Sequence, residues 1–156
     1  MLWMWAGGMA PAHAGPQAAP WQEAGAPLQV DSDTLELRGA EGVVLFVGHV
    51  VARQGDLTVQ ADRAEVTFDR QTRALLSVDA TGNVRVEKGE VVATGDRGRY
   101  DAAAGVVTLT GSPKVWRGRD VVAGDRITLY LAEDRSVVEG ARAVLFPGGS
   151  QQQEQR

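Results

Sequence analysis

The sequence predicts an all-β protein in which short strands stack into a curled sheet. Three observations support this. Apolar and polar residues alternate with a period of two through most of the chain, for example along residues 57–61 and 64–68. Glycine- and aspartate-containing turns separate the alternating runs. Valine and threonine are common and no long helical pattern is present, which favours strands over helices.

A repeated frame of glycine and aspartate organises these strands. Each unit has a glycine, a second glycine seven residues later and an aspartate fourteen residues after the first. The three full copies are Gly48-Gly55-Asp62, Gly82-Gly89-Asp96 and Gly111-Gly118-Asp125. A half copy at Asp33 opens the array and another at Gly140 closes it. Units of this length predict a stack in which each repeat buries its apolar face against its neighbours.

The glycines predict how the strands turn and bend. Gly55, Gly89 and Gly118 lie between two alternating runs, where a turn with positive φ is easiest for glycine. The glycines that open each unit lie where one run feeds the next, so we expect a bulge or kink there. Kinks repeated at one height predict a rolled sheet, not a flat one.

Taken in order, the runs and the turns between them define the elements. The first run covers 28–37 and a turn follows at 38–42. Residues 43–47 then lead into the first full unit, and 75–80 lead into the second after a polar turn at 69–73. A turn at 101–105 precedes the third unit, which 107–109 enter. A turn at 133–136 precedes the last strand, which runs to Phe146.

The parity of the alternation predicts an aliphatic interior made of small side chains. The inward positions that we select as candidates to line it are Val44, Phe46, Val50, Leu57, Val59, Val66, Phe68, Val84, Val86, Val91, Tyr100, Leu109, Val115, Val122, Ile127 and Leu129. Such an interior either packs tightly as a core or leaves an elongated apolar slot that takes acyl chains. From the residues alone the packed core is favoured, because filling a core is the usual use of inward side chains.

The ends of the chain differ from the repeats in composition. Residues 1–14 are apolar and end in Ala12-His13-Ala14, which predicts a signal peptide cleaved after Ala14 and export of the mature chain. Residues 15–27 are rich in Pro, Ala and Gly and predict a flexible lead-in. The β domain is expected over 28–146, and the glutamine-rich segment 147–156 is expected to be disordered.

The composition excludes several kinds of chemistry. Cysteine is absent, and His49 is the only histidine after the predicted cleavage site, so no catalytic triad, metal site or cofactor is expected. The Asp-Arg pairs at 62/63, 96/97 and 125/126 recur once per unit, which indicates corners of the fold and not an active site. Both signs of charge are interspersed around a net charge of −4, and no basic stripe predicts a nucleic-acid partner. We therefore expect a protein that is not an enzyme.

Several segments together resemble the OstA-like lipopolysaccharide-transport family. They are LQVDSD at 28–33, FVGHVVARQGDLTVQAD at 46–62, GRYD at 98–101, VTLTGSP at 107–113 and DRITLY at 125–130. The resemblance covers about residues 28–146 and is greatest to the small periplasmic branch of the family. It implies a twisted, open β-jellyroll of stacked antiparallel strands.

The resemblance also implies a ligand and partners. The apolar interior would bind the lipid A part of lipopolysaccharide. The edge strands around 28–37 and 137–146 would join an LptC-like protein at the inner membrane, an LptD-like protein at the outer membrane, and further copies of this chain head to tail. Pairing of this kind would cover sheet edges that otherwise favour aggregation.

Three alternatives remain open from the sequence. The first is a β-solenoid filament of the bactofilin kind, although the unequal Asp-to-Asp steps of 29, 34 and 29 residues and the cleavage site count against it. The second is a member of the same family in the LptC role. The third is a carbohydrate-binding jelly roll, for which Trp116 is the one exposed aromatic that the alternation offers.

Overall fold

The computed structural model describes residues 27–148 and consists almost entirely of antiparallel strands. The predicted signal peptide, nearly all of the lead-in and the tail from residue 149 lie outside the described residues. The elements are β1 (Gln29–Asp31), β2 (Thr34–Arg38), β3 (Val43–Gln54), β4 (Leu57–Phe68), β5 (Leu75–Lys88), β6 (Val91–Asp101), β7 (Val106–Thr110), β8 (Lys114–Arg117), β9 (Asp120–Ala123), β10 (Arg126–Tyr130), the 3₁₀ turn η1 (Leu131–Glu133), β11 (Arg135–Glu139) and β12 (Arg142–Val144).

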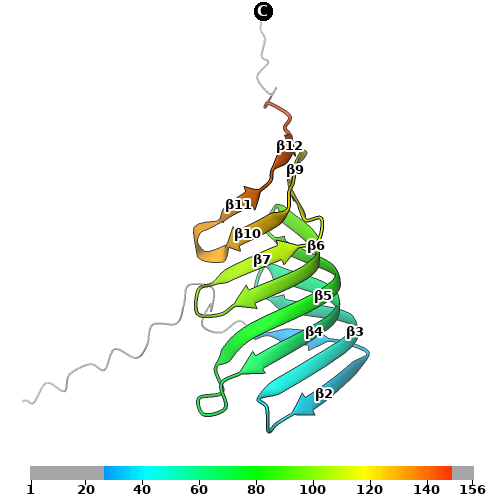
Figure 1. The fold of residues 1–156 in the computed structure, drawn as a ribbon, viewed down its shortest axis with the longest axis vertical. Helices are drawn as coiled ribbons and strands as arrows, with labels where there is room; N and C mark the ends of the chain where they lie inside the picture. The colour runs from blue at the N-terminus through cyan, green and yellow to red at the C-terminus, as the bar shows by residue number, and fades with distance from the viewer. Residues whose placement is uncertain (1–26, 149–156) are drawn as a thin grey trace, which may run out of the picture.

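The strands form a single sheet that is folded over on itself. The two halves of β3, before and after a bend, pair with β2 and β1, and the two halves of β6 pair with β8 and β7. One half of the sheet, the β7 arm, has the order β2-β3-β4-β5-β6-β7-β10-β11. The other half, the β8 arm, has the order β1-β3-β4-β5-β6-β8-β9-β12. Figure 1 shows the strands stacked from β2 at one end to β12 at the other.

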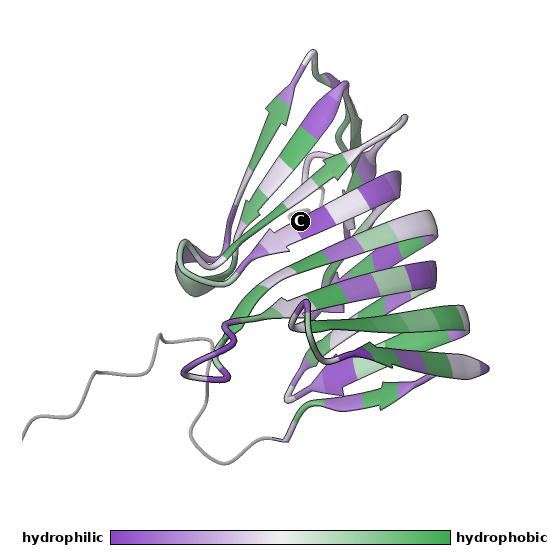
Figure 2. Ribbon diagram, turned by 60° about the horizontal axis from the view of Figure 1, so that its bottom comes forward, coloured by the Kyte–Doolittle hydropathy of each residue, from purple (hydrophilic) through white to green (hydrophobic). Residues whose placement is uncertain are grey.

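We call each long strand, or pair of short strands, that runs through both arms one rung of the stack. Within residues 27–148 there are eight rungs: the four long strands β3 to β6, and the pairs β1/β2, β7/β8, β9/β10 and β11/β12. This is the twisted, open jellyroll of antiparallel strands that the sequence predicts. Figure 2 shows hydrophobic and hydrophilic residues alternating along the strands, as a sheet with one buried face requires.

The bend in each rung falls at the predicted glycines and aspartates. Between β3 and β4 the register shifts from Val47↔Arg63 to Val50↔Ala61, so two residues of β3 face one residue of β4. Gly48 adopts φ +84° and His49 φ +49° at this β-bulge. The sequence predicts separate short segments on either side, whereas each long strand runs through the bend, because one bulge accommodates the change of direction.

An aspartate packs against a glycine at every second step of the stack. A Cβ atom placed on Gly82 would lie 2.8 Å from Cβ of Asp62, and one placed on Gly48 would lie 2.9 Å from Cβ of Asp33. The same contact joins Asp96 to Gly111 and Asp125 to Gly140. The repeated Asp thus occupies the space that only a glycine leaves free, which explains why both recur together.

At two of the four corners, the residue after the glycine reinforces this contact. His49 Nδ1 lies 2.7 Å from Asp33 Oδ2, and Asn83 Nδ2 donates to Asp62 Oδ2 at 3.0 Å. His49 is therefore an exposed corner residue that pairs with Asp33. Of the repeated arginines, Arg126 reaches Glu139 on the neighbouring β11, with 3.8 Å between Nε and Oε2.

Two apolar clusters fill the interior between the arms. One lies near the N-terminal rungs and includes Phe46, Val50, Ala64 and Val66. The other spans the middle and C-terminal rungs around Leu109 and Ile127, both of which have no exposed surface. Leu45 is also buried although its parity places it on the opposite side of β3 from Phe46.

Candidate ligand-binding groove

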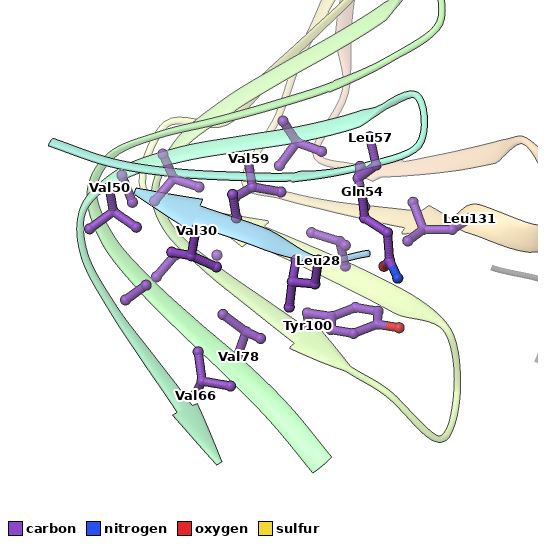
Figure 3. A pocket seen from close by; sticks show the side chains of 18 of the residues that line it. Leu28, Val30, Val50, Gln54, Leu57, Val59, Val66, Val78, Tyr100 and Leu131 are labelled. Atoms are coloured by element: carbon purple, nitrogen blue, oxygen red, sulfur yellow. The ribbon is translucent and has the colours of Figure 1, made fainter. Parts of the chain in front are cut away.

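An apolar cavity of about 300 Å³ separates the two arms over the N-terminal and middle rungs. This volume is at the lower end of the range of about 300–1,000 Å³ that small-molecule sites occupy. Figure 3 shows Val50 at one side of the pocket, and the side chains of Gln54 and Tyr100 at the other. Both arms contribute lining residues, so the fold in the sheet creates the cavity.

The walls come from β1, β3, β4, β5, β6, β7 and η1. The lining residues are Leu28, Val30, Phe46, Val50, Ala52, Gln54, Gly55, Asp56, Leu57, Val59, Ala61, Ala64, Val66, Leu75, Val78, Ala80, Val84, Val86, Lys88, Gly98, Arg99, Tyr100, Val107, Leu131 and Ala132. Small residues such as Ala61, Ala80 and Gly98 leave the space that larger side chains would fill. Within residues 27–148 no polar or charged side chain is fully buried, so this interior is apolar throughout.

Half of the candidate interior residues selected from the sequence line this cavity. They come from the four long strands and share an inward side chain in the N-terminal or middle rungs: Phe46, Val50, Leu57, Val59, Val66, Val84, Val86 and Tyr100. These side chains point into one cavity because they alternate with outward side chains on each strand. The extra residue at each Asp-Gly corner then changes which alternate positions face inward.

The other half lie elsewhere in the interior. Val44 and Phe68 pack against the N-terminal cluster, and Val91 and Val122 pack against the larger cluster. Leu109, Val115, Ile127 and Leu129 are themselves buried members of that larger cluster. In the C-terminal rungs these side chains therefore form a packed core, which is the one of the two alternatives that the residues alone favour.

Some lining residues were not among the candidates. Leu28 and Val30 come from the first rung, where alternation over a three-residue strand is too short to fix which face is buried. Ala132 and Leu131 come from η1, which the sequence places at the edge of a turn. Val78 and Ala80 follow the alternation of β5, and its parity could have identified them.

The polar groups of the groove lie at its rim. Lys88 Nζ lies 3.5 Å from Asp56 Oδ2, and Arg99 Nη1 donates to both oxygens of Asp79 at 2.7 and 2.8 Å. These cations and carboxylates pair with each other across neighbouring strands. Burial raises the pKa of the Tyr100 hydroxyl well above its usual value, so this side chain stays neutral at ordinary pH.

Two further kinds of feature were sought in the part of the chain that the structure describes. No group of three or more His, Cys, Asp or Glu side chains in residues 27–148 is arranged to hold a metal ion. The same part of the chain contains no helix with the length and hydrophobicity needed to cross a membrane. What the arrangement can do is bury an apolar ligand between two sheets while keeping charged groups at the entrance.

The fold and groove together define a protein of the open jellyroll class with an apolar interior. A family model described as "LptA/(LptD N-terminal domain) LPS transport protein" matches residues 29–135. The chain belongs to this family, which confirms the OstA-like identification made from the sequence. The description makes this a family of lipopolysaccharide transport proteins.

Individual relatives support the same placement. The lipopolysaccharide export system protein LptA of Escherichia coli K12 is 26% identical over 70% of this chain and 62% of its own length. The protein R00383 of Rhizobium meliloti is 28% identical over 67% of this chain and 56% of its own. LptD of Aeromonas hydrophila is 28% identical over 85% of this chain but only 16% of its own. The chain thus spans little more than half of the first two relatives.

A solved structure has the same fold. LptH of Pseudomonas aeruginosa, described as the LptA-homologous periplasmic component of the lipopolysaccharide transport device, superimposes with a TM-score of 0.71. The match covers 78% of this chain and 96% of that one at 19% sequence identity. This likeness confirms the predicted open β-jellyroll.

Proposed function

We propose that this chain carries lipopolysaccharide through the periplasm, holding the acyl chains of lipid A in the groove between its two arms. The observation that carries the proposal is the apolar cavity, whose walls are aliphatic and whose charged groups stay at the rim. Each buried CH₂ group contributes about 0.8 kcal/mol, so a chain of about twelve carbons would contribute about 10 kcal/mol if fully buried. Apolar burial alone can therefore hold the ligand.

The open ends of the sheet support a role as a bridge between other proteins. At the first rung Leu35 and Leu37 of β2 are exposed, and at the last rung Val144, Leu145 and Phe146 are exposed. An exposed apolar edge strand is a site for pairing with another sheet. We infer that these edges bind an LptC-like protein, an LptD-like protein and further copies of this chain.

The direction of the rungs makes head-to-tail pairing geometrically consistent. Neighbouring rungs run antiparallel, so the first and the eighth rung run in opposite directions. A second copy placed with β1/β2 against β11/β12 would therefore continue the antiparallel sheet. The alternation of aspartate and glycine at the corners would also continue across the contact, because Gly140 of one copy would precede Asp33 of the next. Heterologous contacts of this kind extend into filaments.

The proposed location is the periplasm. The support is the signal-peptide pattern that ends at Ala14 and the similarity to LptH, which is described as periplasmic. N-terminal sequencing of the protein purified from a periplasmic extract tests this location. A mature chain that starts at Gly15 is expected, whereas a cytosolic protein that retains Met1 would contradict it.

Photocrosslinking in cells tests the carrier function directly. A photoreactive amino acid at Val59 or Val78, both in the wall of the groove, is expected to capture lipopolysaccharide. The matched control is Arg85, which is exposed on β5 and pairs with Gln60, next to Val59. Capture at Arg85 and not at Val59 or Val78 would overturn the proposal.

Members of the lipopolysaccharide-transport family can act as a bridge between partners or in the LptC role, and an experiment distinguishes these two roles. A bridging chain is expected to pair through both end rungs, whereas a chain that passes its ligand to a single sheet partner needs only one of them. Copurification with each partner after introducing a lysine at Leu35 or at Val144 distinguishes the two, because each change affects a different end.

A further inference from the structure

The lining of the groove extends toward the C-terminus as far as Leu131 and Ala132 of η1. A second, small pocket of about 20 Å³ lies beyond it, with room for about one water molecule. The two pockets share Val86, Lys88 and Leu131, so these three side chains form the partition between them. Leu109 and Ile127, which belong to the same apolar cluster as Leu131, are fully buried.

Leu131 is the member of this partition that comes from the far end of the stack. It begins η1, between β10 and β11, whereas Val86 and Lys88 belong to β5 on the other side of the fold. Only 9% of Leu131 is exposed, and it packs within the larger apolar cluster. Figure 3 shows it at the opposite side of the pocket from Val50.

Two contacts hold the segment around Leu131 in place. Its N–H donates to the carbonyl oxygen of Gly105 at 3.2 Å, which fixes η1 to the turn between β6 and β7. Arg117 at the tip of the β8 arm reaches Asp134, just after η1, with 3.5 Å between Nη2 and Oδ1. The two arms are thus joined at this point, whereas the groove separates them over the preceding rungs.

We propose that Leu131 is the end wall that determines how long an acyl chain the groove accepts. The proposal rests on the proposed lipid-binding function and adds a specificity-determining residue to it. A chain that enters between the arms extends along the aliphatic walls until its terminal methyl group meets the Leu131 side chain. Carbons beyond that length remain in water and add nothing to the affinity.

The test measures the affinity of the purified chain for straight-chain fatty acids from decanoate to stearate, by displacement of a dansyl-labelled fatty acid. For the unmodified chain the affinity is expected to rise about fourfold per added methylene group and then to level off at one length. Leu131→Ala removes three carbons from the wall and is expected to move that length upward by about two carbons. Leu131→Val, which removes one carbon and perturbs folding less, is expected to move it by a smaller amount.

The control is Leu76→Ala, since Leu76 is 47% exposed and lies outside the lining. The affinity of this variant is expected to level off at the same fatty-acid length as that of the unmodified protein. Circular dichroism establishes that each variant is folded. If folded Leu131→Val and Leu131→Ala level off where the unmodified chain does, the end-wall assignment is overturned while the carrier function stands. If the unmodified chain binds neither fatty acids nor lipopolysaccharide, the carrier function itself is overturned.

Discussion

Replacing Gly82 with alanine tests the Asp-Gly corner that folds the sheet. Gly82 has φ +80°, and an added Cβ would lie 2.8 Å from Cβ of Asp62, closer than atoms can approach. The matched control is Gly89, which has φ +58° in an exposed turn and nothing within 4 Å of an added Cβ. Both substitutions place alanine in the left-handed region, but only one of them also displaces a neighbour.

The expected costs follow from these two contributions. A left-handed conformation costs an L-residue about 1–2 kcal/mol, which is the whole effect expected for Gly89→Ala. Gly82→Ala also displaces the Asp62 carboxylate from Asn83, and a hydrogen bond to a charged group contributes about 1.5–3 kcal/mol. We therefore expect Gly82→Ala to lower the free energy of unfolding by about 3–4 kcal/mol.

Urea denaturation followed by far-ultraviolet circular dichroism measures both costs. In an Asp62→Gly background the extra cost of Gly82→Ala is expected to fall to about that of Gly89→Ala, because the displaced side chain is gone. Equal costs for the two single variants, or an unchanged difference in that background, would refute the role given to the corner.

Three further predictions concern a titrating pair, the core and the sheet edge. The hydrogen bond to Asp33 raises the pKa of His49 above its usual value of 6.5. The stability that this pair contributes is therefore complete below pH 6.5 and is lost as the pH rises through the raised pKa. His49→Asn should remove this pH dependence of the melting temperature, and an unchanged pH profile would contradict the role given to the pair. Ile127→Ala should lower the free energy of unfolding by about 2–5 kcal/mol in urea denaturation, since Ile127 is fully buried; a loss below about 1 kcal/mol would show a loose core. Leu35→Lys should abolish concentration-dependent assembly in sedimentation velocity without lowering the melting temperature; unchanged assembly would exclude β2 as a contact.

The sequence was sufficient to predict the strands and their inward faces because both depend on local patterns. The glycines of the repeat are fixed by backbone geometry, as the positive φ values of Gly48 and Gly55 illustrate. The change of parity at Asp62 and Arg63 could also be predicted, since two adjacent polar residues interrupt the alternation there.

The extent of the groove could not be predicted in this way. Inward parity is the same for Val59, which lines the cavity, and for Leu129, which lies in the packed core. The difference depends on the separation of the arms at each rung, which contacts between the arms such as that of Arg117 with Asp134 restrict. Such contacts join residues far apart in sequence, so no local pattern reports them.

Filling the groove with a large side chain tests the central claim most directly. Val59→Trp places an indole between the arms, whereas Arg85→Trp places the same group on the exposed side of the neighbouring strand. If lipid A chains lie in the groove, Val59→Trp should weaken the binding of lipopolysaccharide to the purified chain by at least about tenfold, since it displaces two or more buried methylene groups. Arg85→Trp should leave the affinity unchanged. Equal affinities for the two folded variants would contradict the claim that the ligand binds between the arms.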